Sequence, residues 1–173
     1  MNQIRQKRKI INRLAVEEEL QSKIGDGVYD SSMRPKILSV LKMALIEGKA
    51  EVQKRFEVAG ANTNFGSEVM SGNTFLVDQL VRILFDVATN RAYPVANKST
   101  SEKLCLVAVG GYGRSELAPF SDVDLMFLIP YKETPYSEQI IEFVLYMLWD
   151  MGLKIGHSTR SADDVVRLAK RDL

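Results

Sequence analysis

The sequence predicts a mixed α/β (α+β) fold, in which an N-terminal helical segment over residues 1–94 precedes an α/β core over residues 95–173. Two observations favour this division. Apolar residues recur at helical spacing through the first half of the chain. The second half holds two uninterrupted apolar runs of strand length, at 104–109 and 123–129, and an amphipathic helical pattern follows them.

Composition narrows the class of protein. The chain has 173 residues, of which 46% are apolar and 26% charged, as in ordinary globular proteins of about one domain. Its 23 basic and 22 acidic side chains give a net charge of +1, which disfavours nucleic acid or an anionic membrane as a partner. One cysteine and one histidine exclude an internal disulfide and a His/Cys zinc cluster. With no membrane-spanning run and no secretory signal pattern, we expect a cytoplasmic protein.

The first half predicts three helices. Residues 1–24 form a polar helix with a thin apolar stripe that includes Leu14, and Gly25 ends it. Ser31 and Ser32 are candidate N-caps for a helix over 33–58.

Glycines mark two further features of this half. Gly48 lies on the apolar stripe of the 33–58 helix and predicts a close approach by another helix. Residues 59–73 are rich in Gly and Asn and predict a loop before a helix over 74–90, and residues 91–103 predict a linker. This half holds no evident chemistry.

The second half begins with two strands. Residues 104–109 predict a central strand buried on both faces, with Cys105 as a small hydrophobic residue. Gly110 and Gly111 end that strand, and a helical turn and loop over 112–121 lead to the strand at 123–129.

Three elements complete the chain. Ser137 is the expected N-cap of an amphipathic helix that ends near Met151, with Gly152 at its C′ position. Residues 153–160 predict a third strand. Ser161 and Asp164 have the spacing of a capping box that opens a last helix.

The candidate chemistry lies between the two apolar strands. Side chains of a strand alternate between its faces, so Asp122 and Asp124 project together while Val123 enters the core. Two adjacent carboxylates favour a positive partner, and Mg²⁺ takes one or two carboxylates together with substrate phosphates. Two metal ions sharing such a pair activate a nucleophile and stabilise a leaving phosphate.

Gly110 and Gly111 fit the same picture, because residues without Cβ adopt positive φ and let backbone N–H groups approach a phosphate. Arg114 has the fork of donors that pairs with phosphate oxygens. Each feature also has a structural interpretation: a plain turn for the glycines, a solvated or capping role for the acids, and an ion pair with Glu116 for Arg114.

Together these features resemble the DNA polymerase β-like nucleotidyltransferase superfamily, whose pattern is an apolar-Gly-Gly strand end, a spacer of about ten residues and Asp-apolar-Asp. Two longer motifs, VGGYGRSELAPFSDVDL at 109–125 and LWDMGLKIGHSTR at 148–160, are more specific. They resemble the N-terminal region of the bacterial bifunctional uridylyltransferase/uridylyl-removing enzymes that modify the PII signal protein.

The resemblance implies a nucleotidyltransferase core with a mixed sheet that transfers UMP from UTP to a tyrosine hydroxyl of PII and releases pyrophosphate. Mg²⁺ is the implied cofactor. Asp122 and Asp124 are the implied metal ligands and catalytic residues, and Gly110 and Gly111 hold the triphosphate. Arg114 and Ser121 are further substrate-binding candidates.

Two departures from the family shape the expectation. Family enzymes are several times longer and carry an HD phosphohydrolase domain and two glutamine-sensing ACT domains. With one histidine, this chain is expected to lack the removing activity and to be truncated at the C-terminal end of its core. Many superfamily members also carry a third carboxylate on a neighbouring strand, where this chain offers Gly156, His157 and Ser158.

Alternatives stay open at this point. The motif does not read the base, so transfer of AMP or another nucleotide is possible, and so is an inert nucleotide-binding module. Nucleic-acid polymerisation is disfavoured by the near-zero net charge. His157 is either a general base or, as we favour, a hydrogen-bonded strand residue. Trp149 and Tyr146 are expected in the core or between domains, and Tyr112 covers the phosphate loop or shields its turn.

Overall fold

The computed structural model describes residues 6–59, 65–96 and 99–171. Four helices form the N-terminal part: α1 (Lys7–Ile10), α2 (Arg13–Ile24), α3 (Met33–Ala59) and α4 (Phe65–Val87). They are followed by β1 (Cys105–Ala108), α5 (Gly110–Gly113), β2 (Val123–Ile129), α6 (Pro135–Asp150), β3 (Ile155–Ser161) and α7 (Ala162–Arg171). The mixed α+β class and the helical N-terminal segment are confirmed.

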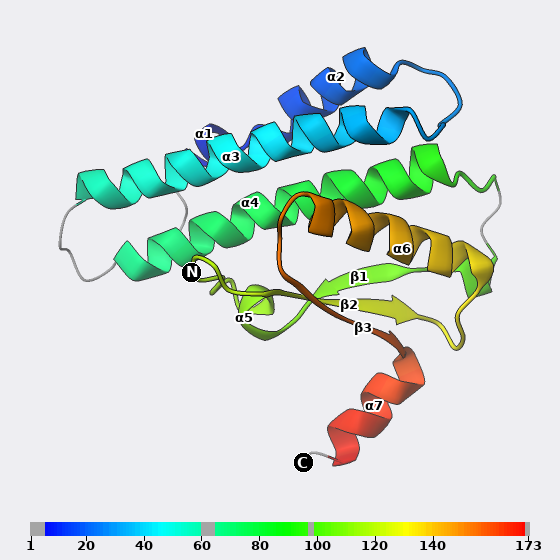
Figure 1. Cartoon of the computed structure of the whole chain (residues 1–173). Helices are drawn as coiled ribbons and strands as arrows, with labels where there is room; N and C mark the ends of the chain where they lie inside the picture. The colour runs from blue at the N-terminus through cyan, green and yellow to red at the C-terminus, as the bar shows by residue number, and fades with distance from the viewer. Residues whose placement is uncertain (1–5, 60–64, 97–98, 172–173) are drawn as a thin grey trace.

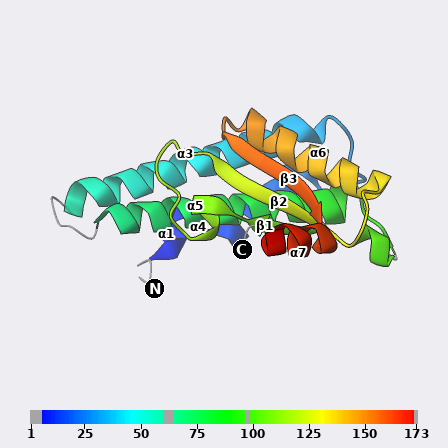
Figure 2. The same ribbon diagram turned by 90° about the horizontal axis from the view of Figure 1, so that it is seen from below.

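Figure 1 shows the arrangement in layers. The long helices α3 and α4 run antiparallel, α6 lies beside α4, and the sheet lies below them. Seen from below in Figure 2, the strands lie in front of α4, and Figure 1 shows α7 projecting from the end of β3 away from the sheet. No helix within the described ranges combines the length and apolar character that a bilayer crossing requires.

The first predicted helix is two helices. α1 ends at Ile10, Ile11 is extended, and α2 begins at Arg13; residues 1–5 lie outside the described part of the chain. The break lets Ile10 and Ile11, adjacent in sequence, both reach the core. Leu14, predicted on the apolar stripe, is 64% exposed, so its placement on the stripe was wrong. Gly25 ends α2 with a φ of +68°, as predicted.

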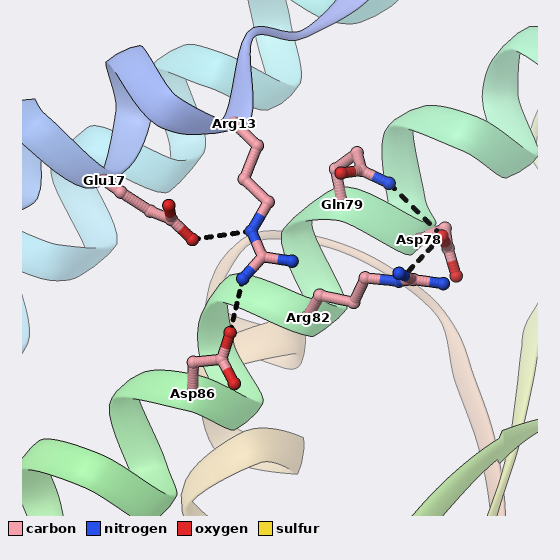
Figure 3. Close-up of polar contacts among 6 residues, drawn as sticks. All are labelled: Arg13, Glu17, Asp78, Gln79, Arg82 and Asp86. Carbon is pink, nitrogen blue, oxygen red and sulfur yellow. Dashed lines mark hydrogen bonds and ion pairs between the residues drawn. The ribbon is translucent and has the colours of Figure 1, made fainter.

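Arg13 joins α2 to α4 (Figure 3). Its Nε donates to Glu17 Oε1 at 2.6 Å, and its Nη2 donates to Asp86 Oδ2 at 2.5 Å. Asp78 and Arg82 form an ion pair of 3.0 Å along α4 itself. One guanidinium therefore bridges a carboxylate of its own helix and a carboxylate of the next layer.

The close helix approach predicted at Gly48 is confirmed. A Cβ built on Gly48 would lie 2.4 Å from Leu76 Cδ1 of α4 and 2.9 Å from the backbone oxygen of Ile10. Only hydrogen fits at that contact.

The loop predicted over 59–73 was mostly wrong, because α4 begins at Phe65 and residues 60–64 lie outside the described chain. Gly72 serves packing rather than a turn: its Cβ would lie 3.1 Å from Val52 Cγ2 of α3. Asn73 Nδ2 donates to the Leu117 carbonyl at 3.4 Å. Tertiary contacts thus offset the low helix propensity of these residues.

The predicted linker contains short helical turns. A π-helical turn over Ala88–Ala92 extends α4, and a 3₁₀ turn over Thr100–Glu102 precedes β1. The predicted helix end at residue 90 falls inside the π-helical turn.

The sheet has the order β1-β2-β3, with β1 antiparallel and β3 parallel to the middle strand β2. It is mixed, as implied. β2 alternates buried and half-buried residues, so one face packs under the helices. β1 pairs only with β2 among the described strands, and Cys105 is exposed. The prediction of a central strand buried on both faces was wrong for β1, because an apolar run does not show which strands flank it.

The later caps are partly as predicted. Thr134, not Ser137, is the N-cap of α6: its Oγ1 accepts from the Ser137 N–H at 3.2 Å, while Ser137 Oγ accepts from the Thr134 N–H at 2.9 Å. Pro135 stands at the first helical position, so the helix begins earlier in the chain than the predicted cap at Ser137. Gly152 has a φ of +83° just after α6, as expected. Ser161 and Asp164 form the predicted capping box of α7.

Both segments contribute to one hydrophobic core. The largest fully buried side chains come from α3, α4, β2 and α6, and they include Leu41, Leu80, Leu84, Phe127 and Leu148. The boundary near residue 94 stays a prediction.

Candidate functional site

The predicted glycine turn lies directly against the middle strand. The Val109 N–H donates to the Asp124 carbonyl at 3.0 Å, and the chain then turns into α5. Gly110 has a φ of +58°, the left-handed conformation that its glycine predicted. The first N–H groups of α5 lack acceptors within the helix.

Asp124 lies between two glycines that come from different elements. A Cβ on Gly110 would stand 2.6 Å from Asp124 Oδ2, and a Cβ on Gly156 of β3 would stand 2.4 Å from Oδ1. Asp124 and Gly156 are in register across the parallel β2–β3 pair. The half-buried carboxylate therefore occupies space that exists only because both neighbours lack side chains.

Asp122 precedes β2 by one residue and is exposed. Val123, between the two acids, is 2% exposed, and its N–H donates to the Lys154 carbonyl at 2.8 Å. That bond fixes the start of the strand and the alternation of its side chains. Within the described ranges, no group of three or more His, Cys, Asp or Glu side chains is arranged to hold a metal.

Arg114 and Ser121 lie on the exposed loop that joins α5 to β2. Arg114 Nε donates to Glu116 Oε2 at 2.9 Å, the ion pair given above as its structural alternative. Both side chains are exposed, so the ion pair contributes little to stability. Ser121 Oγ donates to the Ala118 carbonyl at 2.8 Å, next to Asp122.

Tyr112 anchors the glycine turn to the helical layer. Its side chain is 3% exposed, and burial, with Asp78 of α4 adding to it, raises the pKa of its phenol well above the usual range. Of its two predicted roles, shielding the turn is the one the structure supports. Leu117 is also buried, and its N–H donates to Thr74 Oγ1 of α4 at 3.2 Å.

His157 lies away from the carboxylate. It is in register with the buried Leu125, one residue beyond Gly156, so it occupies the other face of β3. It is exposed and stands edge-on to Trp149, with ring centroids 5.9 Å apart. Trp149 and Tyr146 are 42% and 48% exposed, so the core position predicted as one of two alternatives was wrong, and a position between domains stays a prediction.

Sequence reasoning noted Gly156 only as a missing acid and overlooked its contact with Asp124. The signal that reveals it is the parallel register of β3 with β2, which a sequence does not specify. The structure thus brings together Gly110, Asp124 and Gly156. Asp122 is exposed just before β2, and Arg114 is exposed on the loop after α5.

Comparison with known proteins gives a consistent set of relatives. The bifunctional uridylyltransferase/uridylyl-removing enzyme of Rhodospirillum rubrum is 47% identical over 171 residues, which is 98% of this chain. Those of Azospirillum brasilense and Novosphingobium aromaticivorans are 44% and 45% identical over 167 and 170 residues. The chain spans about 18% of the length of each. No family model matches the chain. No solved structure matches it either.

Proposed function

We propose that this chain forms a uridylyl-transfer site. The reason is that nearly its whole length is related to part of the bifunctional uridylyltransferase/uridylyl-removing enzymes. The proposed reaction transfers UMP from UTP to a tyrosine hydroxyl of the PII signal protein. The observation that carries the proposal is the half-buried Asp124 carboxylate, positioned between Gly110 and Gly156 with Asp122 two residues away.

The donor set fits Mg²⁺. Two carboxylates at the start of one strand offer hard oxygen ligands and leave room for phosphate oxygens and water, which complete magnesium coordination. Asp122 and Asp124 would hold the metal, which when bound neutralises charge that develops on the phosphates.

The chain's own residues supply binding and orientation. The backbone N–H groups at Gly110 and Gly111 would bind phosphate oxygens of UTP, and Arg114 would exchange Glu116 for another phosphate oxygen. The phenolic oxygen of the acceptor bonds to the α-phosphorus, the bond to the pyrophosphate oxygen breaks, and the phenolic proton is released. The close approach of the two glycines restricts the space open to the Asp124 carboxylate, which supports this role.

The test is calorimetric titration of UTP, and then of ATP, in Mg²⁺ and in EDTA. We expect UTP to bind only with the metal and more tightly than ATP. The Asp122→Asn/Asp124→Asn variant should lose that binding. As a control, Glu133→Gln/Glu142→Gln also removes two negative charges, at exposed positions elsewhere, and should retain UTP binding.

A folded chain that binds neither nucleotide would overturn the proposal. A clear preference for ATP would instead favour adenylyl transfer. Incubation with PII and Mg²⁺–UTP supplies the second readout, a mass increase of one UMP on a tyrosine-containing peptide.

A further inference from the structure

A cavity of about 840 Å³ lies between α3, α4 and the loop over 117–121. Its walls are mostly apolar side chains from both helices and the loop, among them Val52, Phe56, Met70, Val77, Leu117 and Phe120. Leu153 and Lys154, in the connection between α6 and β3, also line it. We refer to this space as the α3–α4 groove. Its volume is in the range of ligand and side-chain binding sites.

Two aromatic side chains at the groove are exposed to solvent. Phe56 of α3 is 50% exposed, and Phe120 of the loop is 96% exposed. Phe120 also has a φ of +67°, a left-handed conformation that is strained for a bulky residue. An exposed ring held in a strained backbone two residues before Asp122 indicates binding rather than folding.

The groove lies next to the proposed transfer site along the chain. Ser121 and Val123, the neighbours of Asp122 in the chain, both line it. Because side chains alternate along a strand, Val123 points away from the face that holds Asp124. The groove wall at Val123 and the Asp124 carboxylate therefore lie on opposite faces of β2, and a protein acceptor is large enough to contact both.

The charged residues that line the groove indicate the kind of partner that it binds. Lys49 of α3 and Lys154 line the groove, and among the described residues that line it there is no Asp or Glu. An apolar surface with two ammonium groups complements apolar side chains accompanied by a carboxylate.

We propose that the α3–α4 groove docks the protein acceptor, through a segment near the modified tyrosine that carries apolar side chains and a carboxylate. The proposal rests on the proposed function for the existence of a protein acceptor. It adds where that protein binds, and it makes acceptor affinity depend on residues remote from the carboxylates.

The experiment measures two affinities on the same variants. The binding of fluorescently labelled PII signal protein is followed by anisotropy, and Mg²⁺–UTP binding is followed by calorimetry. Lys49→Glu and Phe56→Ser alter the groove. Lys42→Glu and Ile46→Ser make the same kinds of change at exposed positions of α3 outside it. Circular dichroism is the control that checks whether each variant is folded.

We expect each groove variant to weaken PII binding by at least about tenfold, as anchoring residues do, while UTP binding stays unchanged. The two control variants should bind both partners like the original chain. Added salt should weaken PII binding to the original chain more than to Lys49→Glu, because the variant lacks one cation.

Three results would overturn the docking proposal: PII affinity that is equal in all variants, UTP affinity that falls in the groove variants, or no PII binding by the folded original chain. Failure of the proposed function reads differently. In that case the original chain binds no Mg²⁺–UTP, yet PII binding still responds to Lys49→Glu.

Discussion

At the scale of single residues, the position of Asp124 depends on what its neighbours lack. Gly110 belongs to a turn and Gly156 to a neighbouring strand, yet each would collide with the same carboxylate if it carried a Cβ. The packing that holds the carboxylate thus comes from opposite sides, and it is sensitive to a single methyl group.

Gly156→Ala is expected to weaken Mg²⁺–UTP binding by at least about tenfold, because the new methyl group displaces Asp124 Oδ1. Calorimetric titration measures the effect. Ser158→Ala, two residues along the same face of β3, is the control and should bind UTP normally.

A double variant separates positioning from general damage. In an Asp124→Asn background, Gly156→Ala should cause little additional loss of UTP binding, since it acts through a carboxylate that is already absent. Full additivity of the two losses would mean that Gly156 acts elsewhere.

At the scale of elements, glycine marks close packing in the long helices. Gly48 and Gly72 both stand where α3 meets its neighbours, whereas a Cβ on Gly66, at the start of α4, would meet nothing within 4 Å. The same residue type therefore has opposite consequences at different positions.

Gly48→Ala should lower the free energy of unfolding by about 1–3 kcal/mol, because the methyl group overpacks against Leu76 and the Ile10 carbonyl. Gly66→Ala should leave it unchanged or raise it by up to about 1 kcal/mol through helix propensity. Urea denaturation of the two variants checks the contrast, and equal effects would refute it.

The capping box of α7 predicts a pH dependence. Hydrogen bonds from Ser161 lower the pKa of Asp164 below its ordinary value. A carboxyl whose folded pKa is lowered stabilises the fold above its unfolded pKa, and that contribution is lost as pH falls through the folded pKa.

Helical order at the start of α7 should therefore decrease on acidification, as seen by NMR chemical shifts of residues 162–165. In Ser161→Ala, the pKa of Asp164 should return toward the ordinary carboxyl range. An Asp164 titration identical in the two proteins would contradict the assignment.

At the scale of the whole molecule, helices and sheet share one core, so they are expected to unfold together. Trp149, the only tryptophan of the sequence, reports on α6, whereas far-ultraviolet circular dichroism is dominated by the helices. The two signals should give coincident urea transitions.

Leu80→Ala in α4 should lower the free energy of unfolding by about 2–5 kcal/mol, because Leu80 is completely buried. Both signals should report the same decrease. A shift in circular dichroism without one in Trp149 fluorescence would instead support two independent domains divided near residue 94.

Local sequence patterns predicted most of the helices and strands and indicated where the proposed chemistry lies. Apolar runs at 104–109 and 123–129 specified two strands, and Gly110 and Asp124 could be assigned to one site. Such features depend on residues near each other in the chain, where side-chain period and backbone freedom give direct signals.

Other features of the fold depend on contacts between residues that are distant in the sequence. Tertiary structure extended α4 back to Phe65 because contacts with α3 and the Leu117 carbonyl offset poor helix propensity. It left β1 with a single partner among the described strands, and it brought Gly156 against Asp124 through parallel pairing. Neither strand order nor register is written in a local pattern, because both follow from how whole elements bury their apolar faces together.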